Sequence, residues 1–226
     1  MLHNVLFIGN SHTYFNYMPQ MLAALVNAED RGFKLAVHQC TGEGAGLEWH
    51  WNNSATRDTI RAKPWDYIVL QDRSGGPLED PDSFKRHARL LDDDIRNQGS
   101  RTMLFLTWAN RSRPETQAIL ANTYQMTAQK LQAELAPVGL AWEAIQQLDP
   151  GIELHHQDGR HANPIGSYLS ACVFYSVMFN TSPEGLPGIF KYKGKVWVDL
   201  EIDSASLLQK TAWKTVSTLH TLYGLP

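Results

Sequence analysis

The chain has 226 residues, of which 43% are hydrophobic and 19% are charged, and its formal net charge is −3. These values are typical of a folded globular protein and exclude a disordered chain, a coiled coil and a collagen-like repeat. No block of basic residues interrupts the sequence, so we expect neither a nucleic acid nor a charged membrane surface as a partner.

The first residues lead almost directly into the apolar run Val5-Leu6-Phe7-Ile8. No basic segment or small-residue cleavage site precedes it, so no signal peptide is visible and we expect a cytoplasmic protein. No segment holds the roughly 18 consecutive apolar residues that a membrane span needs. Two cysteines, Cys40 and Cys172, cannot form a disulfide framework. We therefore expect residues 1–226 to form a single domain, whose oligomeric state the sequence does not indicate.

Short apolar or β-rich runs, bounded by polar or turn residues, predict buried parallel strands. A weaker fifth strand is expected near Val138 to Trp142. The four stronger runs are Val5 to Ile8, Lys34 to His38, Tyr67 to Leu70 and Met103 to Leu106.

Helical periodicities lie between and after these runs. Asn163-Pro164 predicts an N-cap with proline at the first helical position, and the helix that follows runs to about Phe179. A last helix is expected from Asp203 or Ser204 to Gly224. The earlier helical patterns cover Met18 to Val26, Phe84 to Ile95, and Leu120 to Leu135, the last of which Pro114 could open.

The alternation of strands and helices predicts an α/β fold, with a central, mostly parallel five-stranded sheet between two helical layers. Residues 183–200 break this rhythm. Their Tyr192-Lys193-Gly194-Lys195-Val196 predicts a hairpin turn, so this segment is expected to be a flap or hairpin insertion.

In an open parallel sheet, ligands bind beyond the carboxyl ends of the strands. The sequence that follows each strand is therefore where chemistry is expected. Those loops are residues 9–13, 41–46, 71–76 and 107–110, and a further polar segment, Asp158-Gly159-Arg160-His161, precedes a capped helix.

These loops together hold the groups that acyl transfer needs. A serine hydroxyl becomes a nucleophile when a base within hydrogen-bond reach takes its proton, and the base needs a partner that orients it. Ser11 follows the first strand, while Asp158 and His161 stand three residues apart with the flexible Gly159 between them. The sequence therefore predicts Ser11 as nucleophile, His161 as general base and Asp158 as the carboxylate that orients it.

The oxyanion that forms during acyl transfer needs fixed hydrogen-bond donors. The backbone N–H groups of Ser11 and Gly44 are the expected donors, because a glycine lets the backbone approach a ligand closely. The side-chain amide of Gln71 is the expected third donor. The register of its loop leaves Arg73 and Ser74 as alternatives.

This set of residues resembles the SGNH (GDSL-like) hydrolase superfamily. The resemblance rests on Gly9-Asn10-Ser11, Gly44, the loop after the third strand, and Asp158-Gly-Arg-His161, and it covers roughly residues 5–180. It implies a flavodoxin-like three-layer α/β/α sandwich that hydrolyses esters and thioesters, including O-acetyl groups on carbohydrates. It also implies the same roles for Ser11, His161 and Asp158.

Two positions depart from the pattern of that superfamily. Asn10 stands where an aspartate is usual, and the third block lacks the usual Gly-x-Asn-Asp. The segment from Val69 to Ser74 instead resembles a glutamine-bearing version found in some carbohydrate acetylesterases.

Several further side chains are expected near the cleft as substrate contacts, and aromatic rings at its rim would suit a sugar. These candidates are Asn10, His12, Trp49, Arg73 and Trp108.

A metal site is the main competing chemistry, because His155, His156, Asp158 and His161 are residue types that bind zinc. Their spacing matches no zinc motif, so we expect no metal and no cofactor.

The sequence thus predicts a serine ester hydrolase that acts on a small ester with a short acyl chain, such as an O-acetylated carbohydrate. A thioesterase or lipid esterase stays open as an alternative. So does a non-catalytic flavodoxin-like module that binds a small molecule, because the third block is altered.

Overall fold

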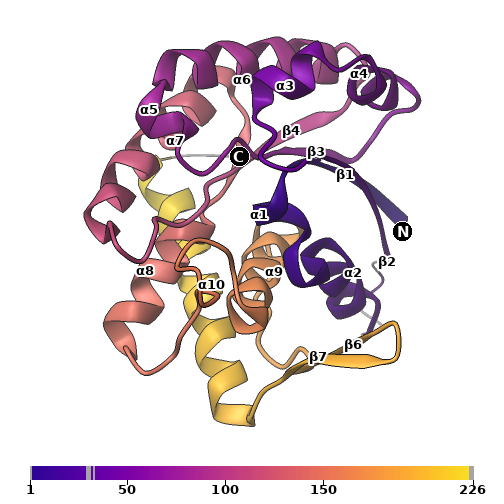
Figure 1. Ribbon diagram of the computed structural model, residues 1–226. Helices are drawn as coiled ribbons and strands as arrows, with labels where there is room; N and C mark the ends of the chain where they lie inside the picture. The colour runs from indigo at the N-terminus through magenta and orange to yellow at the C-terminus, as the bar shows by residue number, and fades with distance from the viewer. Residues whose placement is uncertain (1, 29–31, 33, 224–226) are drawn as a thin grey trace.

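The computed structural model describes residues 2–28, 32 and 34–223. Within these residues the main sheet has five parallel strands in the order β2-β1-β3-β4-β5 (Figure 1). This order is the flavodoxin-like arrangement, and it confirms the predicted α/β fold. The strands are β1 (Leu2–Gly9), β2 (Lys34–Thr41), β3 (Tyr67–Leu70), β4 (Arg101–Phe105) and β5 (Glu134–Ala136).

The central strands β1, β3 and β4 are largely buried on both faces, and their alternate side chains enter two separate cores. In β1, Val5 and Phe7 belong to one buried cluster, whereas Leu6 and Ile8 belong to the other. This is why the strand is a continuous apolar run rather than an alternating one.

Helices cover both faces of the sheet and complete the three layers (Figure 1). The cluster around Val5 and Phe7 is closed by α2 (Met18–Ala28), α8 (Val138–Leu148), α9 (Pro164–Phe179) and α10 (Ile202–Tyr223). The opposite cluster is closed by α3 (Leu47–Asn52), α4 (Ser54–Arg61), α6 (Pro81–Arg96) and α7 (Gln117–Leu131).

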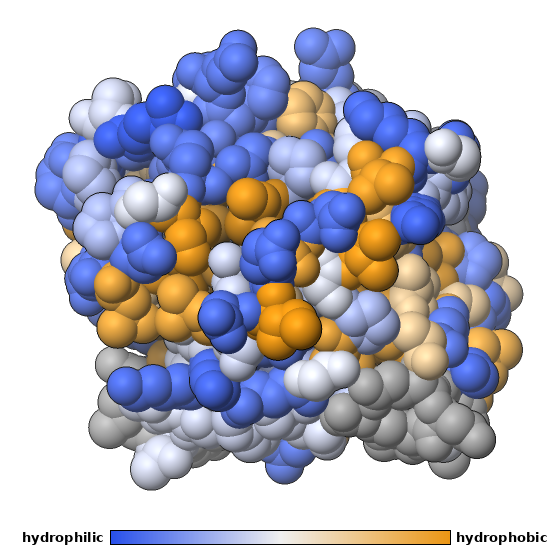
Figure 2. All heavy atoms as spheres, turned by 90° about the horizontal axis from the view of Figure 1, so that it is seen from below, coloured by the Kyte–Doolittle hydropathy of each residue, from blue (hydrophilic) through white to orange (hydrophobic). Residues whose placement is uncertain are grey.

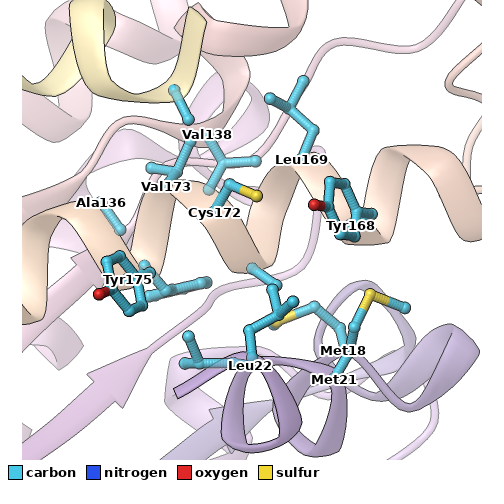
Figure 3. Close-up of a cluster of buried hydrophobic side chains, with 14 of the residues drawn as sticks. Met18, Met21, Leu22, Ala136, Val138, Tyr168, Leu169, Cys172, Val173 and Tyr175 are labelled. Atoms are coloured by element: carbon cyan, nitrogen blue, oxygen red, sulfur yellow. The ribbon is translucent and has the colours of Figure 1, made fainter. Parts of the chain in front are cut away.

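Helix α9 is the most deeply buried of these helices, and it lies across α2 (Figure 3). Met18, Met21 and Leu22 point from α2 toward α9, whose Leu169 and Cys172 are fully buried. The predicted N-cap is confirmed, because the Asn163 side chain accepts a hydrogen bond from the backbone of the first turn. The start of α9, three residues after His161, is thereby capped.

The predicted fifth strand is wrong in position. Residues 138–142 begin helix α8, in which Val138, Ala141, Trp142 and Ile145 are buried at helical spacing. The fifth strand lies earlier, at Glu134–Ala136, because α7 ends at Leu131 and Gln132 adopts a left-handed conformation that turns the chain. The other four strands, and helices α2 and α6, match the predicted positions to within three residues, whereas no helix was predicted at α3 and α4.

The predicted hairpin is confirmed as β6 (Ile189–Tyr192) and β7 (Lys195–Asp199), an antiparallel pair. Lys193 and Gly194 at its turn both have positive φ angles, as the short turn requires. Helix α10 begins one residue before the predicted start, while its predicted end at Gly224 lies outside the described residues.

The lower face of the molecule, which includes the hairpin, has no continuous apolar surface in the view of Figure 2. Hydrophobic side chains there are interrupted by hydrophilic ones. Ile202 is 85% exposed, and Ile189 and Val196 are about half exposed. No described helix has the length and apolar character needed to cross a membrane.

Candidate active site

The candidate nucleophile, Ser11, is the first residue of the short helix α1 (Ser11–Tyr14), which begins where β1 ends. Asn10 caps this helix, since its Oδ1 accepts the N–H of His12 at 3.0 Å. The Asn10 amide also donates to the carbonyl of Ala45 at 2.8 Å. Asn10 is 2% exposed, so it fastens the loop after β1 to the loop after β2 rather than facing the solvent.

Ser11, His161 and Asp158 form one chain of contacts, as the sequence predicts. The Oγ of Ser11 lies 2.9 Å from Nε2 of His161, and Nδ1 of His161 lies 2.7 Å from Oδ2 of Asp158. A carboxylate can only accept, so Nδ1 carries the proton and Nε2 presents its lone pair to the serine hydroxyl. This is the tautomer that a general base for Ser11 requires.

Asp158 is held by its own loop. Its Oδ1 accepts the backbone N–H groups of Arg160 and His161, at 2.8 and 3.0 Å, and Gly159 between them has a φ of 68°. Desolvation acts to raise the pKa of the Asp158 carboxyl, but the hydrogen bonds from the His161 ring and the two backbone N–H groups outweigh it. The net pKa lies well below its usual range. The carboxylate is therefore ionised wherever His161 can act as a base.

A second loop supports the one that carries Asp158 and His161. It follows β4, and its Arg111 donates from the backbone to the Gly159 carbonyl at 2.9 Å and from the guanidinium to the His156 carbonyl at 2.8 Å. The Trp108 indole N–H donates to the Arg160 carbonyl at 2.9 Å. These bonds connect segments about 45 to 50 residues apart in the chain.

Aromatic rings surround the His161 imidazole. Phe15 stacks on it with ring centres 4.2 Å apart. The centre of the His12 ring lies 5.2 Å from that of His161, and the His12 ring also contacts Trp108. His12 is 6% exposed. Its burial, with the positive charges of His161 and Arg160, lowers the pKa of His12 to about 3. His12 is thus an uncharged aromatic ring packed beside the His161 imidazole.

Trp108 is also buried, because it stacks on Trp142 with ring centres 3.9 Å apart and nearly parallel planes. Of the aromatic residues expected at the rim, Trp49 is the exposed one, at 49%. Its ring lies against Gly42.

Two of the expected oxyanion donors are backbone groups on neighbouring loops. Gly44 has a φ of 62° with open space on its Cβ side, and the Asn10–Ala45 hydrogen bond ties its loop to the residue before Ser11. Neither Ser11 nor Gly44 donates its N–H to another group in the described part of the chain. Both N–H groups are therefore available to a ligand.

Gln71, the expected third donor, is completely buried. Its Oε1 accepts the Asn10 backbone N–H at 2.8 Å and the Thr13 hydroxyl at 2.9 Å, and its Nε2 donates to the neighbouring Asp72 carbonyl. One of the two Nε2 hydrogens is thereby used. Gln71 thus sits directly beneath the Ser11 turn.

Arg73 and Ser74, the two alternatives to Gln71 as oxyanion donor, lie in different surroundings. The Arg73 guanidinium forms an ion pair with Glu79 at 2.6 Å on the surface. Ser74 lies in a pocket of about 140 Å³ between the loops after β3 and β4, together with Leu78 and Trp108.

Of the histidines that suggested a metal site, His155 lies apart from His156 and His161, which both contact Asp158. His155 is buried, and its Nε2 lies 3.0 Å from the Ala109 carbonyl, whereas His156 is exposed. No cluster of three or more potential metal ligands occurs among the residues that the structure describes.

Sequence reasoning missed Thr13, Phe15, Arg111 and the contact between His156 and Asp158. Thr13 and Phe15 stand beside Ser11 in the sequence, but nothing in their type indicates a contact with Gln71 or His161. Arg111 follows the loop after the fourth strand, and that position was the one signal that could have identified it.

No protein-family model and no curated protein sequence matches this chain. Solved structures do. A candidate SGNH hydrolase from Slackia heliotrinireducens is 28% identical, with a TM-score of 0.67 over 79% of this chain and all of the other. A DUF4886 family protein from Bacteroides uniformis is 17% identical, with a TM-score of 0.77 over 96% of this chain and 95% of the other.

A third similar structure is a variant of an acetyl-xylooligosaccharide esterase from Geobacillus. It is 13% identical, with a TM-score of 0.61 over 78% of this chain and 94% of the other. The chain thus has the fold of SGNH hydrolases and related esterases.

Proposed function

We propose that the protein is a serine ester hydrolase of the SGNH type. The observation that carries the proposal is the contact chain in which Ser11 Oγ lies 2.9 Å from His161 Nε2 and His161 Nδ1 lies 2.7 Å from Asp158 Oδ2. Both distances are hydrogen-bond distances, and the order of the groups is that of a serine nucleophile, its base and the orienting carboxylate.

In the first step, Ser11 Oγ attacks the ester carbonyl while His161 Nε2 takes the hydroxyl proton. Asp158 stabilises the imidazolium that forms. The backbone N–H groups of Ser11 and Gly44 hold the oxyanion, and the completely buried Gln71 supports the Ser11 turn from beneath. His161 then protonates the leaving alcohol, which leaves an acyl group on Ser11.

In the second step, His161 takes a proton from water, and the resulting hydroxide attacks the acyl-serine carbonyl. Collapse of this second oxyanion breaks the bond to Ser11 Oγ, which recovers its proton from His161. The products are a carboxylic acid and the free enzyme, so one ester and one water are consumed in each cycle.

The substrate we propose is an ester with a short acyl chain, such as an O-acetyl group on a carbohydrate. The similar fold of an acetyl-xylooligosaccharide esterase supports the same substrate class. The exposed Trp49 is a surface on which a sugar ring could stack.

The test is hydrolysis of p-nitrophenyl acetate, butyrate and octanoate by the wild type, Ser11→Ala and Ser54→Ala, each with and without EDTA. Ser54 is an exposed serine on α4 and serves as the matched control. We expect activity that decreases with chain length, survives EDTA and Ser54→Ala, and is lost in Ser11→Ala. Full activity in Ser11→Ala would contradict the assigned nucleophile.

Labelling with a fluorophosphonate separates the remaining outcomes. Labelling of Ser11 in a protein that hydrolyses none of the three esters would indicate a narrow substrate requirement. The absence of both labelling and hydrolysis would favour the non-catalytic binding module, and a preference for octanoate would favour a lipid esterase.

A further inference from the structure

Two histidines contact the same oxygen of the Asp158 carboxylate. Nδ1 of His161 lies 2.7 Å from Oδ2, and Nδ1 of His156 lies 3.3 Å from that oxygen. The proposed mechanism uses only the first of these contacts. His156 is 53% exposed at its side chain, so its ring is accessible to solvent.

The backbone holds His156 in this place. Its N–H donates to the His161 carbonyl at 2.7 Å, and its own carbonyl accepts the Gly159 N–H and the Arg111 guanidinium. The loop that contains Asp158 is thus closed by His156 at one end and His161 at the other. Because the backbone is held, the His156 ring can leave the Asp158 carboxylate only by rotation of its own side chain.

The other charged groups around His156 are paired with an opposite charge or keep the same charge between pH 5 and 8. Arg111 forms an ion pair with Glu153 at 3.3 Å, and Arg160 carries a positive charge at every pH of interest. Asp158 stays ionised because its pKa is held low. An imidazole is the one side chain in this group that ordinarily changes its charge between pH 5 and 8.

We propose that His156 is a positioning residue that acts on His161 through Asp158, and this inference rests on the proposed function. When His156 is protonated, it forms an ion pair with Oδ2 and competes with the His161 ring for that oxygen. Two positive charges on one carboxylate disfavour each other, so protonated His156 opposes protonation of His161. His161 then stays neutral, and able to accept the Ser11 proton, in more acidic solution.

The same interaction has a cost, because the imidazolium that forms during each turnover is also less stabilised. A permanent charge at position 156 should therefore lower the maximal rate while extending activity toward acid. His156 carries the positive charge only in acidic solution, so the maximal rate at higher pH is not lowered.

The experiment compares acetate release from p-nitrophenyl acetate between pH 5 and 9 in the wild type, His156→Gln, His156→Lys and Gln157→Lys. We expect the ratio of kcat/KM at pH 5.5 to that at pH 8.5 to fall about two- to fourfold in His156→Gln. In His156→Lys the ratio should rise and the kcat at pH 8.5 should fall. Gln157→Lys adds the same charge on the next exposed residue and is expected to change the ratio less than His156→Lys.

Salt distinguishes an electrostatic role from a structural one. In about 1 M NaCl, where the screening length is about 3 Å, the ratios of His156→Gln and His156→Lys should converge. Ratios that stay apart in high salt, or that shift in the same direction in both variants, would overturn the proposal.

A titration by NMR tests the inference without any turnover. The His161 ring nitrogens should change their chemical shifts at higher pH in His156→Gln than in the wild type. Equal titrations would overturn the role of His156 and leave the serine esterase standing. A shifted titration in a protein without esterase activity would support the coupling and reject the proposed function.

Discussion

The side-chain carbonyl oxygen of Gln71 lies 2.8 Å from the backbone nitrogen of Asn10, and the Thr13 hydroxyl donates to the same oxygen at 2.9 Å. Asn10 and Thr13 flank Ser11, so a completely buried residue of the third strand's loop fixes both sides of the turn that carries the candidate nucleophile. Gly9 belongs to the same arrangement, because a Cβ there would collide with the Gln71 and Thr13 side chains.

Thr13→Val keeps the shape of the side chain and removes one of these hydrogen bonds. We expect the free energy of unfolding to fall by about 1–2 kcal/mol, because Thr13 is completely buried and the Gln71 carbonyl loses a donor. We also expect kcat to fall while KM changes little. Urea denaturation and initial rates measure both. Thr59→Val, which removes an exposed hydroxyl that bonds within α4, should change stability by less than about 0.5 kcal/mol.

Asp158→Asn changes the tautomer of His161. The amide can still accept the two backbone N–H groups, but an NH₂ group facing Nδ1 would favour a proton on Nε2, which then cannot accept from Ser11. We expect kcat to fall by about 10³- to 10⁴-fold. Circular dichroism should show an unchanged fold. A loss below tenfold would mean that His161 does not depend on this carboxylate.

Arg111→Ala tests the support that the loop after β4 gives to Asp158 and His161. The backbone bond to Gly159 remains, but the bond to the His156 carbonyl and the ion pair with Glu153 are lost. We expect a decrease in kcat of about 10- to 100-fold, because small displacements of a catalytic pair are costly. Guanidinium at millimolar concentration should restore part of it.

Arg113→Ala is the matched control for Arg111→Ala, since Arg113 is a neighbouring exposed arginine whose nearest carboxylate, on Glu115, lies 4.0 Å away. It should keep the wild-type rate and show no response to guanidinium. A similar decrease in both variants would attribute the effect to surface charge rather than to the loop.

His12 should make the fold sensitive to acid. Its pKa is about 3 in the folded protein and about 6.5 as a free side chain, so the unfolded chain binds the proton more readily. Stability is therefore lost as the pH falls from about 6.5 toward 3. Between pH 7.5 and pH 4 this contribution is at most about 3 kcal/mol.

His12→Asn removes that contribution. We expect the variant to lose less stability than the wild type between pH 7.5 and pH 4, as measured by urea denaturation at each pH. Comparing each protein with itself cancels the cost of the substitution at neutral pH. Parallel losses in the two proteins would show that another group accounts for the acid sensitivity.

Much of the fold could be predicted because the central strands β1 and β3 are buried on both faces. Val5 to Ile8 and Tyr67 to Leu70 are apolar throughout, which is the pattern of a covered parallel strand. The fifth strand was misplaced because three residues, Glu134–Ala136, are too few to show a period. The helical spacing of Val138 and Ile145 is the stronger signal in this segment.

The candidate site was predictable where short-range spacing or strand ends determine position. Asp158 and His161 are three residues apart in the sequence. Ser11 follows β1, and the carboxyl ends of all the parallel strands lie at one edge of the sheet. The direction of the Gln71 amide could not be predicted, since it depends on Asn10 and Thr13 about 60 residues away. The contacts of Arg111 likewise depend on how two loops meet.

Ser11 and His161 are separated by 150 positions in the chain, yet their side chains are in contact. The contact between Ser11 and His161 can form only after β1 and the segment before α9 have folded. The sheet must also have assembled between its two helical layers. Hydrolysis would therefore report on completed folding. In a refolding experiment, esterase activity should return no earlier than the burial of α9, and fragments ending before residue 158 should remain inactive however much helix they contain.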